Sequence, residues 1–378
     1  MLSISCVCKR WYLRRMPQRL AVAVFCLLGV TLNVWLACAV LLPGAWTGRN
    51  DFLSLYAGAR LSGTSDLYSR EAVRQVQFDA VGERFPSLRF SRLPYYGLLL
   101  KPLAPLPYRA AYVVWLAWGA AVLAGFAALW PGGRSRWIMT CWFLPAFEAL
   151  FNGQDAAHLV LWIAIAALLV RRDRPFWAGV ALALCASKFH LAVLLPVVIL
   201  GQRRWRVAAG GAVAGLVMLA LSFAAAGRRW PWDYYAVLTD PLIHPTVLHM
   251  PSLHGMQLGI VPEVFGTLVV AISVYLVARA SSFEWALAAA LAGGLLVAFH
   301  TYLADCVVLL PIALQALQIR ALRPAAIALA TPLPWLFLQL PPPLPNFTRT
   351  LILLLVIGSA LLLLRDQLRV DQHPRVRI

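Results

Sequence analysis

The stretch LAVAVFCLLGVTLNVWLACAVLL, residues 20–42, decides the fold class of this chain. It runs for 23 residues without a charged side chain, and about 20 apolar residues suffice for a helix to cross a hydrocarbon core of roughly 30 Å. A basic segment from Lys9 to Arg19 precedes it. The stretch is also longer than the ~7–15 apolar residues of a cleavable signal sequence. We therefore predict an uncleaved membrane-spanning helix, with residues 1–19 as a cytoplasmic basic tail.

Other apolar runs recur along the 378 residues. They occupy residues 109–130, 207–226, 258–277 and 347–364. Hydrophobic residues make up 61% of the chain and charged residues 13%, whereas a soluble domain is about half apolar and about a quarter charged. These values exclude a soluble protein. We predict an all-α, multi-pass integral membrane protein with a single transmembrane domain over residues 1–378.

The formal net charge of +18 has a topological explanation. Arg and Lys occur in short clusters between the apolar runs, and such clusters remain on the cytoplasmic side of a membrane. Aromatic and basic residues do not interleave as in proteins that bind single-stranded nucleic acids, so we expect no nucleic-acid partner. When the spans are threaded through the bilayer, every basic cluster falls on one side. Both termini, including a tail over residues 365–378, are then predicted to be cytoplasmic, in a cell inner membrane.

This topology leaves two long segments on the outer side of the membrane. We call residues 43–93 the first outer loop and residues 227–257 the second outer loop. Residues 52–61 suit a short amphipathic helix that lies on the membrane. Residues 93–105 are apolar but too few to cross, and they contain three prolines. We interpret them as a segment that dips into the bilayer.

Residues 175–200 are expected to enter and leave the membrane on the same side. They lie between the basic clusters 171–174 and 203–206, and both clusters belong in the cytoplasm. With 26 residues, each limb of a re-entrant helical hairpin reaches only about 18 Å at ~1.5 Å per residue. Lys188 and His190 fall at its tip. Irregular backbone at that depth is tolerated where protein or a water-filled cavity surrounds it.

Ionisable side chains collect at the outer ends of the predicted spans. A charge at membrane depth is costly and by default suggests a function. We therefore expect a site that opens on the outer face. The candidates are Asp51, Asp155, His158, Lys188, His190, His249, His254, His300 and Asp305.

Asp51 and Lys188 each have a structural alternative. Asp51 precedes the helix expected at residues 52–61, and aspartate is also a favoured N-cap residue. Lys188 lies in the middle of an apolar hairpin and needs an anionic partner. That partner is either a carboxylate of the protein or a phosphate of a ligand, and the sequence favours neither.

Two further groups of polar residues also have two interpretations. Gln154 and His158 lie on one face of a helix, which suits a binding site or a helix–helix contact. His300, Tyr302 and Asp305 begin a helix at its outer end. Their alternatives are capping and anchoring at the membrane interface.

Several kinds of site find no support in the sequence. The histidines and carboxylates lack the spacing of metal ligands. The seven cysteines include no C-x-x-C pair, which argues against disulfides and structural zinc. Neither a glycine-rich phosphate loop nor a G-x-S-x-G elbow is present. We therefore expect neither a metal ion nor another cofactor.

Several short motifs follow one another along the chain. They are Asn50-Asp51-Phe52, Tyr56-Ala57-Gly58-Ala59-Arg60, Asp66-Leu67-Tyr68, Leu93-Pro94-Tyr95, Asn152-Gly153-Gln154, Lys188-Phe189-His190, and the late group His300, Tyr302 and Asp305. Together they resemble glycosyltransferase family 87, a family of GT-C fold that includes polyprenol-phosphate-mannose-dependent mannosyltransferases. Phe189 and Tyr96 stand where the family usually has proline.

The resemblance implies a GT-C-type bundle and a hexosyltransferase. The donor would be a hexose, with mannose as the expectation, on a polyprenyl phosphate. The acceptor would be a glycolipid or glycan on the outer, periplasmic face. Asp51 matches the family's catalytic aspartate and would act as general base in an inverting displacement. Cations must stabilise the leaving phosphate, and we assign this role to Lys188 and His190, with Arg60 as a further candidate. The other expected substrate-binding residues are Gln154, His158, His300, Tyr302 and Asp305.

Two other classes of protein remain open. A transporter or flippase of a lipid-linked or small anionic substrate also carries charges and broken helices within the membrane, often near the mid-plane and with internal repeats. Here no repeat is evident, and the polar residues gather on one side. A structural or assembly subunit would use the same residues only for packing, and would tolerate alanine at Asp51.

Overall fold

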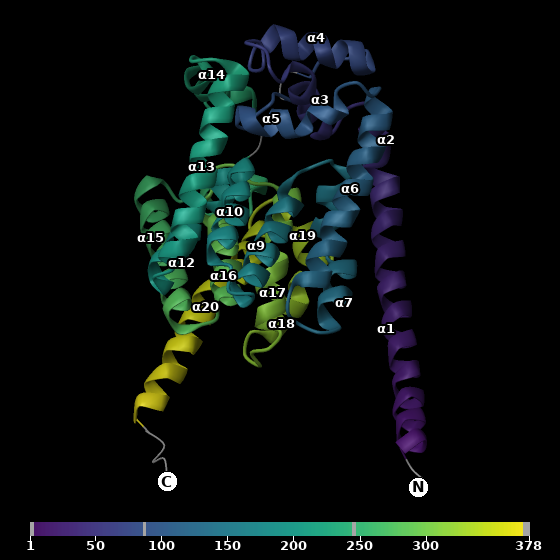
Figure 1. Ribbon diagram of the computed structural model, residues 1–378, viewed down its shortest axis with the longest axis vertical. Helices are drawn as coiled ribbons and strands as arrows, with labels where there is room; N and C mark the ends of the chain where they lie inside the picture. Colours follow the sequence, from purple (N-terminus) through teal and green to yellow (C-terminus); the bar gives the residue numbers. More distant parts are fainter. Residues whose placement is uncertain (1–3, 86–87, 244–246, 373–378) are drawn as a thin grey trace.

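The computed structural model describes residues 4–85, 88–243 and 247–372, with residues 4–19 and 367–372 described by their backbone only. Within these residues every regular element is a helix, so the predicted all-α membrane fold is confirmed. Figure 1 shows a tall bundle of helices with a smaller layer of short helices above it. We call this upper layer the cap.

The bundle is built mainly from apolar helices that run along the long axis of the molecule (Figure 1). Its elements are α1 (Ile4–Val40), α6 (Tyr108–Leu129), α7 (Ser135–Trp142), α8 (Leu144–Phe151), α9 (Ala156–Arg171), α10 (Pro175–Ala183), η2 (Leu184–Lys188), α11 (Phe189–Ala192), α12 (Leu195–Gln202), α13 (Trp205–Ala226), α15 (Ile260–Ala280), α16 (Phe283–Val297), η6 (Leu303–Leu309), α17 (Leu310–Ala316), α18 (Arg323–Leu329), α19 (Leu333–Leu338) and α20 (Pro345–Gln372).

Six helical stretches among the described residues are long and apolar enough to cross a membrane. They are Leu20–Val40, Tyr108–Leu129, Pro175–Ala192, Trp205–Ala226, Ile260–Ala280 and Pro345–Asp366. All except Pro175–Ala192 coincide with spans expected from the sequence. A further pair, α8 and α9, is bent by 118° at the turn between them.

The cap consists of the first outer loop, the segment that joins it to α6, and the first part of the second outer loop. It contains α2 (Leu42–Trp46), α3 (Phe52–Leu61), α4 (Arg70–Val81), α5 (Pro94–Leu100), η1 (Lys101–Leu103), α14 (Trp230–Leu238) and η3 (Pro241–Ile243). The rest of the second outer loop, with η4 (Val247–His249) and η5 (His254–Met256), contacts the bundle, where Arg349 of α20 donates to the carbonyl oxygen of Met250 at 2.9 Å. The apolar segment expected to dip into the bilayer is α5 with η1, and α5 lies beside α3 in the cap (Figure 1).

The first residues of α1 and the last residues of α20 lie at the same end of the molecule, opposite the cap (Figure 1). This is the arrangement that two cytoplasmic termini require. The side chains of the basic segment at residues 9–19 and the tail residues 373–378 lie outside the described part of the chain. The assignment of this end to the cytoplasm therefore stays a prediction.

α16 lies at the centre of the bundle. Its sequence FEWALAAALAGGLLV is apolar on all sides, which suits a helix surrounded by other helices, and almost all of its residues are buried. Its small residues allow neighbouring backbones to approach closely. A Cβ added at Gly294 would lie 1.9 Å from the carbonyl oxygen of Leu191 in α11.

The hairpin expected around residues 175–200 is present. α10 packs closely against the start of α13, where a Cβ added at Gly179 would lie 1.9 Å from the carbonyl oxygen of Val207. The other limb ends at Gln202, just before α13 begins at Trp205. Between the limbs, the backbone leaves helical geometry at Lys188 (φ −128°, ψ 65°). Both limbs thus return to one end of α13, with Lys188 at the bend.

The close contact of α10 with α13 leads to a first prediction. Gly179→Ala should lower stability by about 1–3 kcal/mol, a typical cost of overpacking, because the added Cβ meets a backbone oxygen that cannot rotate away. Thermal unfolding of the purified protein in detergent measures this loss. Gly215→Ala on α13 is the matched control, since nothing lies within 4 Å of its added Cβ. Equal melting temperatures for the two variants would contradict the prediction.

The helix expected at residues 52–61 is present as α3, but its surroundings differ from the expectation. We expected it to lie on the membrane with one polar face. Instead α4, α5, η1 and α6 pack around it, and Phe52, Leu53 and Ala57 have no exposed surface. The rings of Tyr108 and Tyr112 in α6 lie 5.8 and 5.6 Å from the ring of Phe52. This packing fixes the start of α3, and therefore the position of Asp51.

Candidate active site

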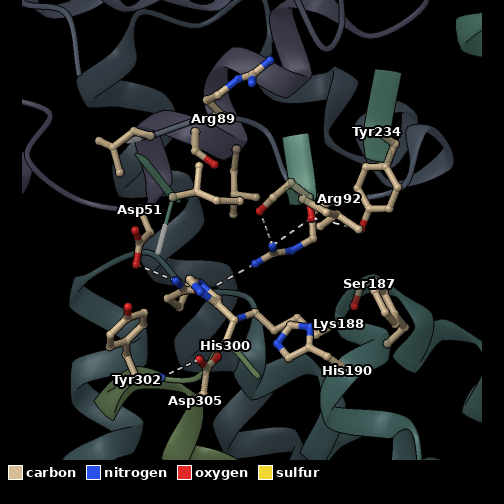
Figure 2. Close-up of a pocket in the computed structure, with 18 of the residues that line it drawn as sticks. Asp51, Arg89, Arg92, Ser187, Lys188, His190, Tyr234, His300, Tyr302 and Asp305 are labelled. Carbon is tan, nitrogen blue, oxygen red and sulfur yellow. Dashed lines mark hydrogen bonds and ion pairs between the residues drawn. The ribbon is translucent and has the colours of Figure 1, made fainter. Parts of the chain in front are cut away.

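A cavity of about 300 Å³ lies where the cap meets the bundle (Figure 2). Ligand sites usually enclose about 300–1,000 Å³, so it is large enough for a small polar group. The lining residues come from the first outer loop, the α8–α9 turn, the hairpin, the second outer loop, and the segment that leads into the first turn of η6. They are Asp51, Ser54, Leu55, Leu88, Arg89, Ser91, Arg92, Gln154, Ser187, Lys188, Phe189, His190, Tyr234, Leu238, Ile243, Phe299, His300, Tyr302 and Asp305.

Asp51 occupies the N-cap position of α3, but its side chain does not cap that helix. Its Oδ2 instead accepts hydrogen bonds from Asn152 Nδ2 at 2.6 Å and from Gln154 Nε2 at 2.5 Å. Its backbone N–H donates to the carbonyl oxygen of Asn152 at 3.0 Å. Among the described residues, Oδ1 has no hydrogen-bond partner. The carboxylate is thus held by one oxygen, while the other is available on the cavity wall.

The turn that holds Asp51 requires a glycine at position 153. Gly153 has a φ of +72°, in the left-handed region that L side chains rarely adopt. A Cβ added there would also lie 2.4 Å from the Cβ of Phe52. The Asn152-Gly153-Gln154 motif is therefore a tight turn that presents two side-chain amides to Asp51.

The pKa of Asp51 is raised above its ordinary value. Burial is the largest cause, because it disfavours the charged form. The hydrogen bond from Gln154 and the positive charge of Lys188 act in the opposite direction, while the charge of Asp305 raises the pKa further. A carboxylate with a raised pKa is a stronger base than an ordinary aspartate.

Lys188 is paired with a carboxylate of the protein. Its Nζ donates to Asp305 Oδ1 and to Gln154 Oε1, each at 2.5 Å, and lies 3.6 Å from Asp155 Oδ1. Asp305 Oδ2 also accepts the backbone N–H of Tyr302 at 3.0 Å and so caps η6. The capping interpretation of Asp305 is therefore correct, and the same side chain also supplies the anionic partner of Lys188.

Arg92 forms a second buried ion pair at the cavity. Its Nε and Nη2 donate to the two carboxylate oxygens of Asp155 at 2.8 and 2.7 Å, a bidentate geometry that fixes the guanidinium plane. Burial alone would raise the pKa of Asp155, but the charge and hydrogen bonds of Arg92 outweigh burial and hold that pKa well below its ordinary value. Asp155 therefore stays ionised and holds Arg92 at the cavity wall.

Three buried polar atoms of residues that line the cavity have no hydrogen-bond partner among the described residues. They are Ser187 Oγ and His190 Nε2, on either side of Lys188 in the chain, and Nε of Arg89, whose other guanidinium nitrogens are paired. Buried polar atoms are nearly always paired in folded proteins, so unpaired atoms on a cavity wall point to a ligand. Figure 2 shows Asp51 on one side of the cavity, and Ser187 and His190 on the other.

The two outer loops are joined beside the cavity by a shared carboxylate. Asp240, which follows α14, accepts hydrogen bonds from Arg70 at 2.7 Å and from Arg89 at 3.0 Å. Tyr234 in α14 donates a long hydrogen bond of 3.4 Å to the carbonyl oxygen of Ser91. These contacts keep α14 against the first outer loop, so that both loops contribute to the cavity wall.

Of the residues predicted to form the site, Asp51, Gln154, Lys188, His190, His300, Tyr302 and Asp305 line the cavity. Arg60 and His158 do not. Arg60 is exposed and donates to the carbonyl oxygen of Ala104 at 3.0 Å. His158 lies behind the wall, where its Nε2 accepts from Trp118 Nε1 at 2.7 Å and its Nδ1 lies 3.0 Å from the carbonyl oxygen of Asp155. These contacts agree with the second interpretation of His158, a contact between helices, and not with a place in the binding site.

Sequence reasoning missed Arg92 and Ser187. Arg92 belongs to a loop that also contains Arg84 and Arg89, and nothing in their spacing distinguishes it from a solvated arginine. Asp155 could have indicated that an arginine such as Arg92 lies at the site, because a carboxylate expected at the end of an apolar span needs a cation. Ser187 adjoins Lys188 and carries no signal of its own.

In residues 4–85, 88–243 and 247–372, no group of three or more His, Cys, Asp or Glu side chains could hold a metal ion. A family model for glycosyltransferase family 87 matches residues 94–311, which is more than half of the chain. Comparisons with curated proteins and with solved structures gave no match. The matched segment contains Gln154, Lys188, His190, His300 and Asp305.

Proposed function

The chain belongs to glycosyltransferase family 87 and is a membrane glycosyltransferase, and from this premise we propose that it uses a polyprenyl-phosphate donor. The transferred sugar is a hexose, with mannose as the expectation. The acceptor is a hydroxyl group of a glycolipid or glycan on the outer face of the cell membrane. The donor arrives on a lipid, so the proposal includes no nucleotide, metal ion or other cofactor.

The composition of the cavity wall is the observation that supports this proposal best. Oδ1 of Asp51, without a partner among the described residues, is suited to take the proton of the acceptor hydroxyl. The acceptor oxygen then attacks the anomeric carbon, and the bond from that carbon to the phosphate oxygen breaks. The bonding electrons remain on the leaving phosphate. A single displacement of this kind inverts the anomeric centre.

The leaving phosphate gains negative charge and needs cations and donors arranged in advance. Arg92 and Lys188 supply fixed positive charge at the cavity. His190 and Ser187 supply polar atoms that have no hydrogen-bond partner in the described part of the chain. We assign the phosphate to this group of four. Ser187 and His190 lie on the side of the cavity opposite Asp51 (Figure 2), and Gln154 joins Lys188 to Asp51. Gln154, His300, Tyr302 and Asp305 also line the cavity, and we assign them to the sugar, between the phosphate and the base.

The direct test is an incubation of the purified protein with a panel of polyprenyl-phosphate sugars and a membrane lipid extract, followed by mass spectrometry. A new glycosylated product that appears with one donor would support the proposal and name the sugar. A parallel flux assay in proteoliposomes tests the transporter or flippase alternative. Transport of a lipid-linked or anionic substrate without a product of sugar transfer would overturn the proposal.

The raised pKa of Asp51 predicts the acid side of the pH profile. Asp51 must be ionised to accept a proton, so kcat/KM should be full above its pKa and fall as the pH drops through it. The fall should begin above the ordinary aspartate value of about 3.9. Gln154→Ala removes a hydrogen bond that lowers this pKa, so the fall should move to higher pH in that variant. An unmoved acid limb in kcat/KM would contradict the assignment of Asp51 as the titrating base.

A further inference from the structure

One face of α6 carries a row of buried aromatic side chains next to the active site. α6 begins beside the cap and runs into the bundle (Figure 1). Tyr108, Tyr112 and Trp115 are spaced by four and three residues, so they lie on the same face of the helix. Their rings lie 5.8, 5.6 and 5.8 Å from the ring of Phe52. Because Phe52 follows Asp51 in the chain, this row packs directly beside the proposed base.

The same row holds the turn between α8 and α9. The hydroxyl of Tyr112 donates to the carbonyl oxygen of Phe151, and Trp115 Nε1 donates to that of Gly153 at 3.0 Å. The carbonyl oxygen of Asn152, between these two, accepts the backbone N–H of the proposed base at 3.0 Å. Three consecutive carbonyl oxygens of the turn are therefore held by groups outside it.

The hydrogen bond from Trp115 acts at the point where the turn leads to the reacting groups. The carbonyl of Gly153 belongs to the peptide group that precedes Gln154. A glycine restrains its neighbouring peptide groups less than any other residue does, and Trp115 is the only donor to this oxygen among the described residues. Gln154 in turn donates to Asp51 at 2.5 Å and accepts from Lys188 at 2.5 Å. The orientation of one peptide group thus determines both contacts of Gln154.

We propose that Trp115 is a positioning residue for sugar transfer, which holds Gln154 in the orientation that contacts the base and the lysine together. This inference rests on the proposed function, because it takes Asp51 as the base. Trp115 does not line the cavity, so it acts only through the turn. A displacement of a reacting group by about 1 Å can cost about 10²-fold in rate, so a hydrogen bond outside the cavity can still have a large effect on transfer.

A purely structural role is the alternative, because a buried indole N–H needs an acceptor wherever it lies. Trp335 in α19 provides the comparison. It is buried like Trp115, its Nε1 also donates to a backbone carbonyl oxygen at 3.0 Å, that of Leu329, and it does not line the cavity. Trp335→Phe therefore removes the same kind of hydrogen bond as Trp115→Phe, at a place where no residue of the proposed site depends on it.

The first experiment measures the melting temperature and kcat of these two variants. Both should lose a similar amount of thermal stability, because each leaves one buried carbonyl oxygen without its donor. Only Trp115→Phe should lower kcat, by about 10- to 100-fold, since Gln154 is then free to leave its position. Equal kcat in the two variants would show that the hydrogen bond from Trp115 serves stability alone.

The pH profile gives a second measurement that a structural role would not change. The hydrogen bond from Gln154 lowers the pKa of Asp51, so its loosening should raise that pKa. The base must be ionised, so the acid-side fall of kcat/KM should move to higher pH in Trp115→Phe and stay in place in Trp335→Phe. The charged groups that act on Asp51 are Lys188, Arg92, Asp305 and Glu148, and the hydrogen bond from Trp115 reaches none of them.

A double-variant cycle tests whether the effect passes through Gln154. If it does, adding Trp115→Phe to Gln154→Ala should change kcat by less than about twofold, because the side chain that Trp115 positions is already absent. Multiplication of the two separate losses would show that Trp115 acts by another route and would overturn the inference.

Tyr112→Phe is the second variant if Trp115→Phe does not fold. It keeps the ring and removes only the hydrogen bond to the carbonyl oxygen of Phe151, which precedes Asn152. Tyr56→Phe is its matched control, because the hydroxyl of Tyr56 donates to a carbonyl oxygen outside the turn, that of Leu106 at 2.9 Å. We expect lower kcat in Tyr112→Phe alone, and equal kcat in both would contradict the inference.

The failure of this inference can be distinguished from the failure of the proposed function. Normal transfer by the unmodified protein, with equal behaviour of Trp115→Phe and Trp335→Phe, would overturn only the role of Trp115. Absence of transfer from every polyprenyl-phosphate sugar by the unmodified protein would remove the proposed function and the inference together.

Discussion

Asp51→Asn should lower the rate of sugar transfer by about 10²–10⁴-fold, the usual contribution of a general base, while the protein still folds and inserts into the membrane. Asparagine has nearly the same shape as aspartate, and its side-chain oxygen can still accept the hydrogen bonds from Asn152 and Gln154. The amide nitrogen then occupies the place of Oδ1. That nitrogen cannot accept a proton, so the acceptor hydroxyl is no longer activated.

The assay compares kcat for transfer in detergent with the melting temperature of the same preparation. Asp66→Asn is the matched control, because Asp66 is an exposed carboxylate in the same outer loop and does not line the cavity. A large loss of kcat with an unchanged melting temperature in Asp51→Asn alone is expected. Near-normal transfer by Asp51→Asn would remove Asp51 from its proposed role and favour the structural or assembly interpretation.

The second large effect is expected at the buried pair of Lys188 and Asp305. Lys188→Met should destabilise the protein by about 3–5 kcal/mol, because removal of one member of a buried ion pair leaves the other charge uncompensated. It should also abolish transfer. Asp305→Asn should reduce stability less, because Nζ of Lys188 still contacts Gln154 Oε1 at 2.5 Å and Asp155 Oδ1 at 3.6 Å.

The double variant Lys188→Met with Asp305→Asn separates structure from catalysis. It removes both charges, so its melting temperature should return most of the way to that of the unmodified protein. Its transfer rate should stay about 10²–10³-fold below that of Asp305→Asn alone, which is the typical loss when one group that stabilises the transition state is removed. Recovery of transfer to the level of Asp305→Asn would mean that Lys188 serves only to balance Asp305.

Much of the architecture could be predicted because the membrane limits the solutions. Backbone polar groups in a bilayer must be satisfied within the chain, so apolar runs become helices. The basic clusters that flank residues 175–200 were enough to predict the hairpin, since both had to remain on one side. The environment of α3 could not be predicted in the same way. Its burial depends on contacts with α4 and α5, which lie outside residues 52–61 in the sequence, so no pattern within those residues could indicate it.

Residues of the candidate site could be predicted where the side chain is charged and its sequence neighbours are apolar. Lys188 and Asp305 stand out because a charge among apolar residues requires a partner. Arg60 was chosen from the resemblance, but on α3 it reaches a backbone carbonyl outside the cavity. Arg92 was missed because a loop arginine acquires its role only from the carboxylate that it meets, and Asp155 is 63 residues away in the chain.

The distance along the chain between Lys188 and Asp305 also constrains how the protein is made. The two residues are separated by 117 positions, so the hairpin is synthesised and inserted before its main counter-charge exists. An unpaired lysine in the centre of a bilayer costs about 2.5–3.5 kcal/mol on insertion scales. Gln154 and Asp155 precede Lys188 in the chain and contact it in the folded protein. Asp155 is paired with Arg92, which also precedes Lys188. The hairpin therefore enters the membrane with one polar contact of Lys188 already synthesised, and its full counter-charge follows only with Asp305.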